Sequence, residues 1–134
     1  MNAMTGSWNL LRRALLADGI ACGAMGALLL FAAVPLEGLL GLETALLRTA
    51  GIILIPFGAL VLYFAAKPHV SHRAVWFIVT VNLLWVVDSI LLLVTGWAEP
   101  TLLGYLFTVG QALAVTVFAG LEYAGLRRSA PALA

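Results

Sequence analysis

Four long apolar stretches, separated by short polar segments, make up nearly the whole chain. Each stretch has about 20 residues, which is the length a helix needs to cross the hydrocarbon core of a bilayer. We therefore predict membrane-spanning helices at about residues 13–34, 45–66, 74–95 and 101–125. The fold class expected is all-α: one membrane domain over residues 1–134, built as a four-transmembrane-helix bundle, with residues 129–134 as a flexible tail.

Proline and glycine mark the three connections between the predicted helices. Pro35 is expected to end the first helix, and the apolar, glycine-broken segment 35–43 is expected to lie on the membrane surface. Pro68 stops the second helix in the segment 67–73, because the residue before a proline is pushed out of the helical region. Segment 96–100 makes the last turn. Such short connections favour consecutive helices arranged as antiparallel up-down hairpins.

The basic residues predict the orientation of these helices. Six of the seven Lys and Arg residues fall at three places: Arg12 and Arg13, Lys67 and Arg73, and Arg127 and Arg128. Each gap between these places is long enough for two crossings, so all three belong on one side of the membrane. Lys and Arg are retained on the cytoplasmic face. We therefore expect an N-in/C-in, multi-pass protein of a bacterial inner membrane. The opposite side carries Glu37, Glu43, Glu99 and a single cation, Arg48.

Composition narrows the partners. The chain is 63% hydrophobic and 10% charged, whereas soluble domains are about 25% charged, so the lipid bilayer is the expected surrounding. No basic patch is large enough for nucleic acid. A lone cysteine, Cys22, excludes an internal disulfide and offers no metal-site spacing. His69 and His72 lack a third ligand, so we expect neither metal nor cofactor.

An N-terminal signal peptide is the alternative to the first helix. Arg12 and Arg13 resemble its basic region, and Ala32 and Ala33 could lie near a cleavage site. Asp18 interrupts the apolar region, however, and the run has spanning length rather than signal length. We retain the helix.

Aromatic residues agree with the predicted membrane interfaces, where Trp and Tyr are enriched. The inner interface would hold Trp8, Tyr63, Trp76 and Tyr123, and the outer one Trp97 and Tyr105. Trp85 is the exception, because it falls near the middle of the membrane and must pack against protein or a ligand.

Asn82 and Gln111 both reach the middle of the membrane on consecutive helices, at about 1.5 Å of rise per residue. A hydrogen bond between them, holding the two helices together, is the simplest consequence. The alternative is that these two residues and Trp85 form an intramembrane polar site that contacts a ligand or an ion.

Asp18 and Glu122 are predicted to lie at the same depth, near the inner surface, on the first and last helices. If the two carboxylates are close, they can share a proton. Alternatively, each reaches the inner surface and meets a cation: Arg13, His69, His72 or Arg127. We leave both interpretations open.

Asp88 lies about two helical turns below the outer surface. A charged group in the membrane costs roughly 2.5–3.5 kcal/mol on insertion scales, so it needs a partner or a role. The candidate partners are Arg48, as an ion pair, and the hydroxyls of Tyr105 and Thr108. Structural pairing and a functional acid remain equal alternatives.

Small residues predict two close-packing surfaces. Gly19, Gly23 and Gly26 lie along one helix, and Gly51 and Gly58 along the next. On the last helix, residues 104, 111, 118 and 122 share one face, which should point into the bundle.

The stretch Val81-Asn82-Leu83-Leu84-Trp85-Val86 resembles uncharacterised small bacterial integral membrane proteins. In size and topology the chain is similar to four-helix groups such as the DoxX-like proteins and the small multidrug transporters, and this resemblance covers architecture only. The transporters centre on one glutamate deep in the first helix, whereas Asp18 is shallow. Their dual-insertion members also need weak charge bias, so the strong bias here disfavours an antiparallel dimer.

No nucleophile–base set, phosphate loop or metal quartet is present, so we do not expect an enzyme. The first functional hypothesis is a non-enzymatic accessory or structural membrane subunit, with a membrane-protein partner or a second copy of the chain. The alternative is a binder or transporter of a small solute or lipid that uses the intramembrane acids Asp18, Asp88 and Glu122.

Overall fold

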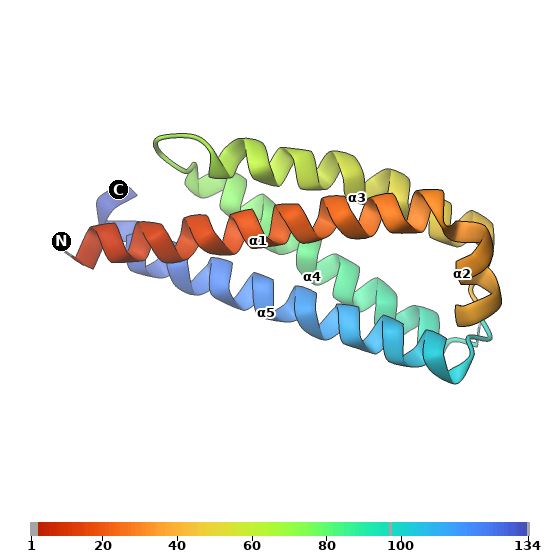
Figure 1. Cartoon of the computed structure of the whole chain (residues 1–134). Helices are drawn as coiled ribbons and strands as arrows, with labels where there is room; N and C mark the ends of the chain where they lie inside the picture. Colours follow the sequence, from red (N-terminus) through yellow and green to blue (C-terminus); the bar gives the residue numbers. More distant parts are fainter. Residues whose placement is uncertain (1–2, 97, 134) are drawn as a thin grey trace.

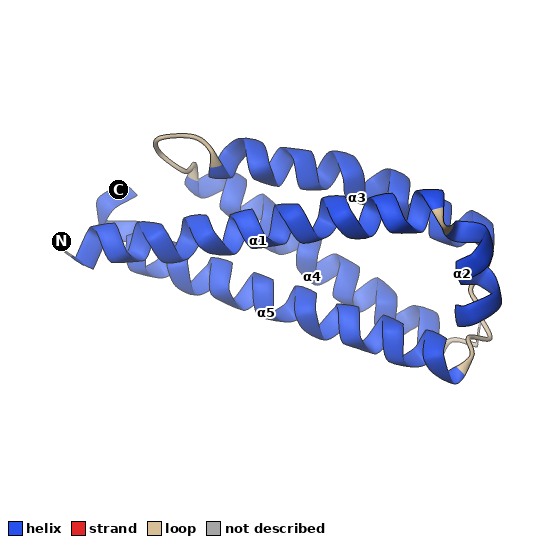
Figure 2. Cartoon of the chain, in the orientation of Figure 1, coloured by secondary structure: helices blue, strands red, loops and turns tan. Residues whose placement is uncertain are grey.

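The computed structural model describes the backbone of residues 3–96 and 98–133, and the side chains of residues 10–96 and 98–128. Within this part every element is a helix, and no strand occurs (Figure 2). The all-α prediction is confirmed. The helices are α1 (Ala3–Phe31), α2 (Ala33–Leu40), α3 (Thr44–Ala65), α4 (His72–Val94) and α5 (Leu102–Leu133). The short helix α2 was not predicted.

Four of these helices are long and apolar enough to cross a membrane, which confirms the four predicted segments in number and composition. The candidate spans are Leu10–Phe31, Thr44–Ala65, His72–Val94 and Leu102–Arg128. Their ends lie within three residues of the predicted ones. Helix α5 continues to Leu133, where a flexible tail was expected. The Trp8 side chain, Trp97 and Ala134 lie outside the described residues.

Helix α1 ends at Phe31, three residues earlier than predicted, because of Pro35. A proline ring clashes with the carbonyl of residue i−4 and cannot donate to it, and for Pro35 that residue is Phe31, where α1 ends. Ala32 leaves the helical region with φ −110° and ψ 21°. The chain then turns into α2, in which Pro35 occupies the tolerated first turn. The segment expected to be a loop is therefore mostly a helix.

Helix α2 connects the ends of its neighbours. The Glu37 carboxylate accepts a hydrogen bond from the backbone N–H of Thr44, the first residue of α3, at 2.9 Å. Thr101, just before α5, donates its hydroxyl to the Leu39 carbonyl at 2.8 Å and its backbone N–H to the Leu40 carbonyl at 3.0 Å. Gly41, with φ 71°, ends α2 in the left-handed region that favours glycine.

The four long helices run along one another, and both chain ends lie at the same end of the molecule (Figure 1). Helix α1 packs against α3 and α5, and α5 also packs against α4. Helix α3 ends and α4 begins at the 66–71 connection, and the two helices diverge away from it (Figure 1). We call the end with Arg12, Lys67 and Arg127 the basic end. The opposite end, with Glu37 and Glu43, is the acidic end.

Glycines determine how closely α1 and α3 approach. A β-carbon on Gly51 would lie 2.7 Å from the Gly26 carbonyl oxygen. One on Gly58 would lie 2.9 Å from the Gly19 carbonyl oxygen. The predicted close packing thus uses Gly19 and Gly26, seven residues apart. A β-carbon on Gly23 would meet nothing within 4 Å, so Gly23 contributes only its backbone to this contact.

Two apolar core clusters fill the interior. The one towards the basic end includes Leu15, Val61 and Ile78, and the one towards the acidic end includes Leu29, Leu40 and Leu54. On α1, Asp18 lies between these two regions, since Leu15 belongs to the first cluster and Cys22 to the second. The buried Asp18 thus lies at the boundary between the two apolar core clusters.

Candidate functional site

Three polar side chains from three helices meet in the interior, and we call Asp18, Asn82 and Glu122 the acid–amide cluster. The Asn82 amide nitrogen donates to Asp18 Oδ2 at 2.8 Å and to Glu122 Oε1 at 3.0 Å. Asp18 and Glu122 are 0% exposed and Asn82 is 3% exposed. The two acids thus lie at one depth, as their positions in the sequence indicated. Neither forms an ion pair with a cation among the described residues.

Asn82 does not bond to Gln111, contrary to expectation. The Gln111 side chain lies nearer the acidic end, where its Oε1 accepts from the Trp85 indole at 2.7 Å and its Nε2 donates to Ser89 Oγ at 2.9 Å. Ser89 in turn donates to the Trp85 carbonyl at 2.8 Å. These bonds hold α4 against α5, and they fix the orientation of the indole ring.

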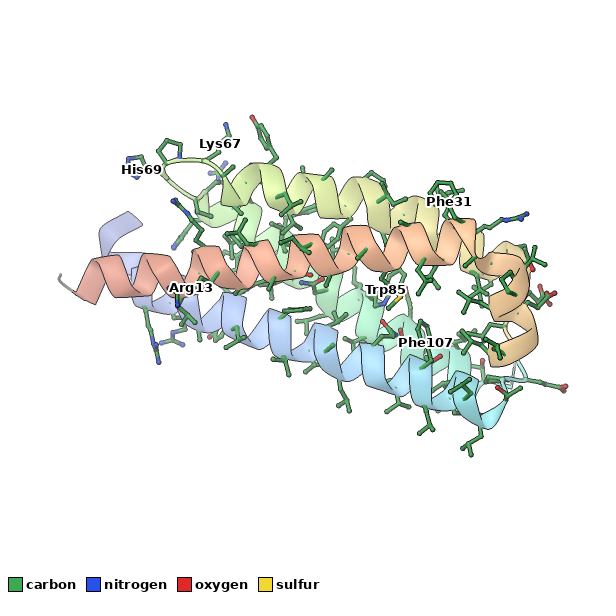
Figure 3. All side chains as sticks on the ribbon, in the orientation of Figure 1. Arg13, Phe31, Lys67, His69, Trp85 and Phe107 are labelled. Atoms are coloured by element: carbon green, nitrogen blue, oxygen red, sulfur yellow. The ribbon has the colours of Figure 1, made fainter. Side chains whose placement is uncertain are left out.

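A cavity of about 410 Å³ lies towards the acidic end, beside this Trp85–Gln111–Ser89 chain. Its lining is mostly apolar, with Met25 and Leu29 from α1, and Phe107 from α5. Trp85 and Phe107 are both labelled in Figure 3. Ligand sites in proteins have volumes of about 300–1,000 Å³ and combine apolar walls with a few polar groups. This cavity, which we call the acidic-end cavity, fits that description.

The mouth of the acidic-end cavity lies between α3 and α4. Its exposed lining residues come from these two helices: Thr49 and Ile53 on α3, and Asp88, Leu91 and Thr95 on α4. This is the side on which α3 and α4 diverge (Figure 1). Because both helices are apolar enough to span a membrane, the mouth opens towards the region that lipid would occupy.

Asp88 is exposed on the rim of this mouth. The proposed ion pair with Arg48 is not formed, and Asp88 makes no hydrogen bond to Tyr105 or Thr108. Within residues 10–96 and 98–128 the carboxylate has no polar partner. The hydroxyls of Thr49 and Thr95 donate to carbonyls of their own helices, at 2.7 Å each. Of the side chains that the structure describes, Asp88 is the one ionisable group that lines the acidic-end cavity.

At the basic end, aromatic rings contact cations. The Lys67 ammonium lies 4.7 Å from the centre of the Tyr63 ring. Arg127 donates to the Tyr123 hydroxyl at 3.0 Å, and Tyr123 packs edge-on against Trp76. Arg12 donates to the carbonyls of Lys67 and Pro68, which fastens α1 to the 66–71 connection. These cations are engaged away from the acid–amide cluster.

Sequence reasoning found the polar residues of both sites but not the wall of the cavity. Leu29, Leu92 and Phe107 look like ordinary lipid-facing or core residues in sequence. The available signal was Ser89, which follows Trp85 by four residues and so shares its face of the helix. No group of three or more His, Cys, Asp or Glu side chains able to hold a metal ion occurs among the described residues.

No family model matches the chain, and neither the curated proteins nor the solved structures contain a significant match. Function must therefore be argued from the two sites themselves.

Proposed function

We propose that this chain is a multi-pass membrane protein that binds a small, mostly apolar molecule carrying a cationic end. The molecule would enter the acidic-end cavity from the lipid, between α3 and α4. Its apolar part would lie against Leu29, Trp85 and Phe107, and its cation against the Asp88 carboxylate.

The unpaired Asp88 at the rim of an apolar cavity carries this proposal. A carboxylate within a spanning segment is unfavourable by roughly 2.5–3.5 kcal/mol on insertion scales. Arg48, the one cation on α3, makes no ion pair with it among the described residues. A bound ammonium group would supply the missing charge, and the indole of Trp85 beside it could add a cation–π contact. Charge complementarity thus favours a cationic amphiphile over a neutral lipid.

The proposed orientation places the basic end in the cytoplasm, with both termini inside and the helices arranged as two antiparallel hairpins. The distribution of Lys and Arg supports it, since short basic connections remain on the cytoplasmic side. The acidic end would then face outwards from a bacterial inner membrane. The acidic-end cavity would consequently lie in the outer leaflet.

Equilibrium binding to the protein in lipid nanodiscs tests the proposal. The probes are a radiolabelled alkyl trimethylammonium and the neutral alcohol of the same chain length. We expect saturable binding of the ammonium probe at one site per chain, and weaker binding of the alcohol. Asp88→Asn should weaken ammonium binding at least about tenfold, equivalent to 1.4 kcal/mol, and leave alcohol binding unchanged.

Two further variants complete the test. Leu29→Trp replaces an aliphatic side chain of the cavity wall with a bulky indole, which should fill the cavity and abolish binding of both probes. Glu43→Gln removes an exposed acid outside the cavity and should change neither. Equal ammonium binding by the wild type, Asp88→Asn and Leu29→Trp would show that the probe only partitions into lipid, and the proposal would be wrong.

An accessory or structural subunit remains the second candidate. Gly110 and Gly120 on α5 are exposed, and a β-carbon on either would meet nothing within 4 Å. Small residues on a spanning helix allow close approach of another helix, from a partner protein or a second copy. Native mass spectrometry after extraction from the source membrane distinguishes this candidate, because it predicts a co-purifying chain that Gly110→Leu releases and Asp88→Asn does not.

A further inference from the structure

The acid–amide cluster is a separate feature that the proposed binding function does not use. Asp18 lies between the two apolar core clusters, and none of the three members lines the acidic-end cavity. The two accepting oxygens of Asp18 and Glu122 are no more than about 6 Å apart, because both bonds end on the same Asn82 nitrogen. Two carboxyl groups are thus enclosed side by side without contact with solvent.

The charge of this cluster is not compensated by the helices around it. Helix α1 contributes Asp18 and Cys22, α5 contributes Glu122, and α4 contributes the neutral Asn82. The α3 residues packed in the same region, such as Val61 and Ala65, are apolar. Cys22 donates a weak hydrogen bond to Asp18 Oδ1 at 3.4 Å. No cation among the described residues bonds to either acid.

The nearest cations by position are held elsewhere. Arg127 follows Glu122 by five residues, is exposed, and donates to the Tyr123 hydroxyl. Arg12 donates to the carbonyls of the 66–71 connection. Arg13, five residues before Asp18, is exposed and makes no ion pair with either acid. His72 and the exposed Arg73 are the first two residues of α4, about 14–15 Å of helix away from Asn82. Two ionised acids would therefore leave two negative charges in the protein interior, which is among the costliest arrangements in a fold.

One oxygen of the cluster also lacks a donor. Asn82 supplies two N–H groups, one to each acid. Glu122 Oε2 is completely buried and accepts no hydrogen bond. An additional proton on either carboxyl group would provide the missing O–H donor, and would reduce the net charge of the pair from −2 to −1.

We propose that Asp18 and Glu122 together bind one proton at neutral pH, so that the acid–amide cluster is an intramembrane proton-binding site. The proton comes from water and forms an O–H bond on one carboxyl group that faces the other. The site joins α1, α4 and α5. Loss of the proton would place two like charges between these helices and push them apart.

Infrared spectroscopy of the protein in lipid nanodiscs tests this site directly. A protonated carboxyl group gives a C=O band well separated from that of a carboxylate, and the band shifts in D₂O. At pH 7 we expect such a band in the wild type and in Asp88→Asn, which removes the other acid of the spanning segments. The double variant Asp18→Asn/Glu122→Gln, which replaces both acids with neutral groups of the same size, should lack it.

A second measurement needs no comparison of spectra between variants. If the folded state holds a proton that the unfolded state releases, stability falls as the pH rises above neutrality. The unfolding temperature of the wild type should therefore decrease between pH 7 and pH 10 by more than that of the double variant. Absence of a protonated-carboxyl band from wild-type protein at pH 7 would overturn the proposal. Its disappearance in Asp88→Asn alone would do the same. The first result has no bearing on ligand binding in the acidic-end cavity, whereas the second would assign the proton to Asp88 and so would also contradict its proposed role as a carboxylate there.

Discussion

Gly58 of α3 lies so close to Gly19 of α1 that a β-carbon on Gly58 would be 2.9 Å from the Gly19 carbonyl oxygen. It would also be 3.0 Å from the Gly23 backbone nitrogen. These are backbone atoms, so a clash can be relieved only by separating the two helices. The distance between α1 and α3 is therefore determined by the absence of a side chain.

Gly58→Ala should consequently destabilise the fold by about 1–3 kcal/mol, the usual cost of overpacking. Gly110→Ala is the matched control, because its β-carbon would meet nothing within 4 Å. Alanine also has the higher helix propensity. Unfolding in mixed micelles with increasing dodecyl sulfate, followed by circular dichroism, measures both. Equal stability of the two variants would show that the α1–α3 contact is looser than described.

Asn82→Leu removes the amide that donates to both Asp18 and Glu122. Leaving a buried acceptor without its donor lowers the stability by about 1–3 kcal/mol. The variant should therefore unfold at a clearly lower denaturant concentration. Thr80→Ala serves as the control on the same helix, since the Thr80 hydroxyl is exposed and donates to the Trp76 carbonyl of its own helix. A fully stable Asn82→Leu protein would mean that the acids do not depend on this donor.

Gln111→Leu should release the indole of Trp85 from its hydrogen-bond acceptor and loosen α4 from α5. A protein in which Trp85 is the only tryptophan, the others being phenylalanine, reports this as a shift of emission to shorter wavelength. A loss of stability of about 1 kcal/mol should accompany the shift. Thr116→Val is the control on α5, because the Thr116 hydroxyl donates only to the Ala112 carbonyl. Unchanged emission in Gln111→Leu would contradict the contact.

The proposed orientation predicts opposite labelling of the two ends of the molecule. In a Cys22→Ala background, single cysteines at Lys67→Cys and Glu99→Cys report the basic and acidic ends. A membrane-impermeant maleimide added to intact cells should label position 99 alone, and both positions after lysis. Labelling of position 67 alone in intact cells would show the opposite orientation. Equal labelling of both positions in intact cells would contradict the four-span arrangement.

Local chemistry explains which parts of the fold were predictable. The hydropathy of the four stretches is a property of each segment alone, so their number and approximate limits follow from the sequence. The prediction for the connection between the first two long helices was wrong, because it assumed that the helix would end at Pro35 itself. The proline ring clashes with the carbonyl of Phe31, four residues earlier, so α1 ends there and the following segment forms α2.

Partners of the polar residues were less predictable. Depth in the membrane correctly grouped Asp18 with Glu122, because depth depends only on the number of residues from the helix end. It wrongly paired Asn82 with Gln111. One residue along a helix turns the side chain by about 100°, so a small difference in helix rotation sends Asn82 to the acids and Gln111 to Trp85.

The sequence by itself determined the all-helical class, the four candidate spans and the presence of acids within them. Only the tertiary structure decided that one amide joins two of these acids, and that α3 and α4 diverge to leave a cavity beside the third. The reason is that spans depend on the transfer of each segment out of water. A contact between side chains depends instead on crossing angle, rotation and glycine-permitted distance, which belong to pairs of helices.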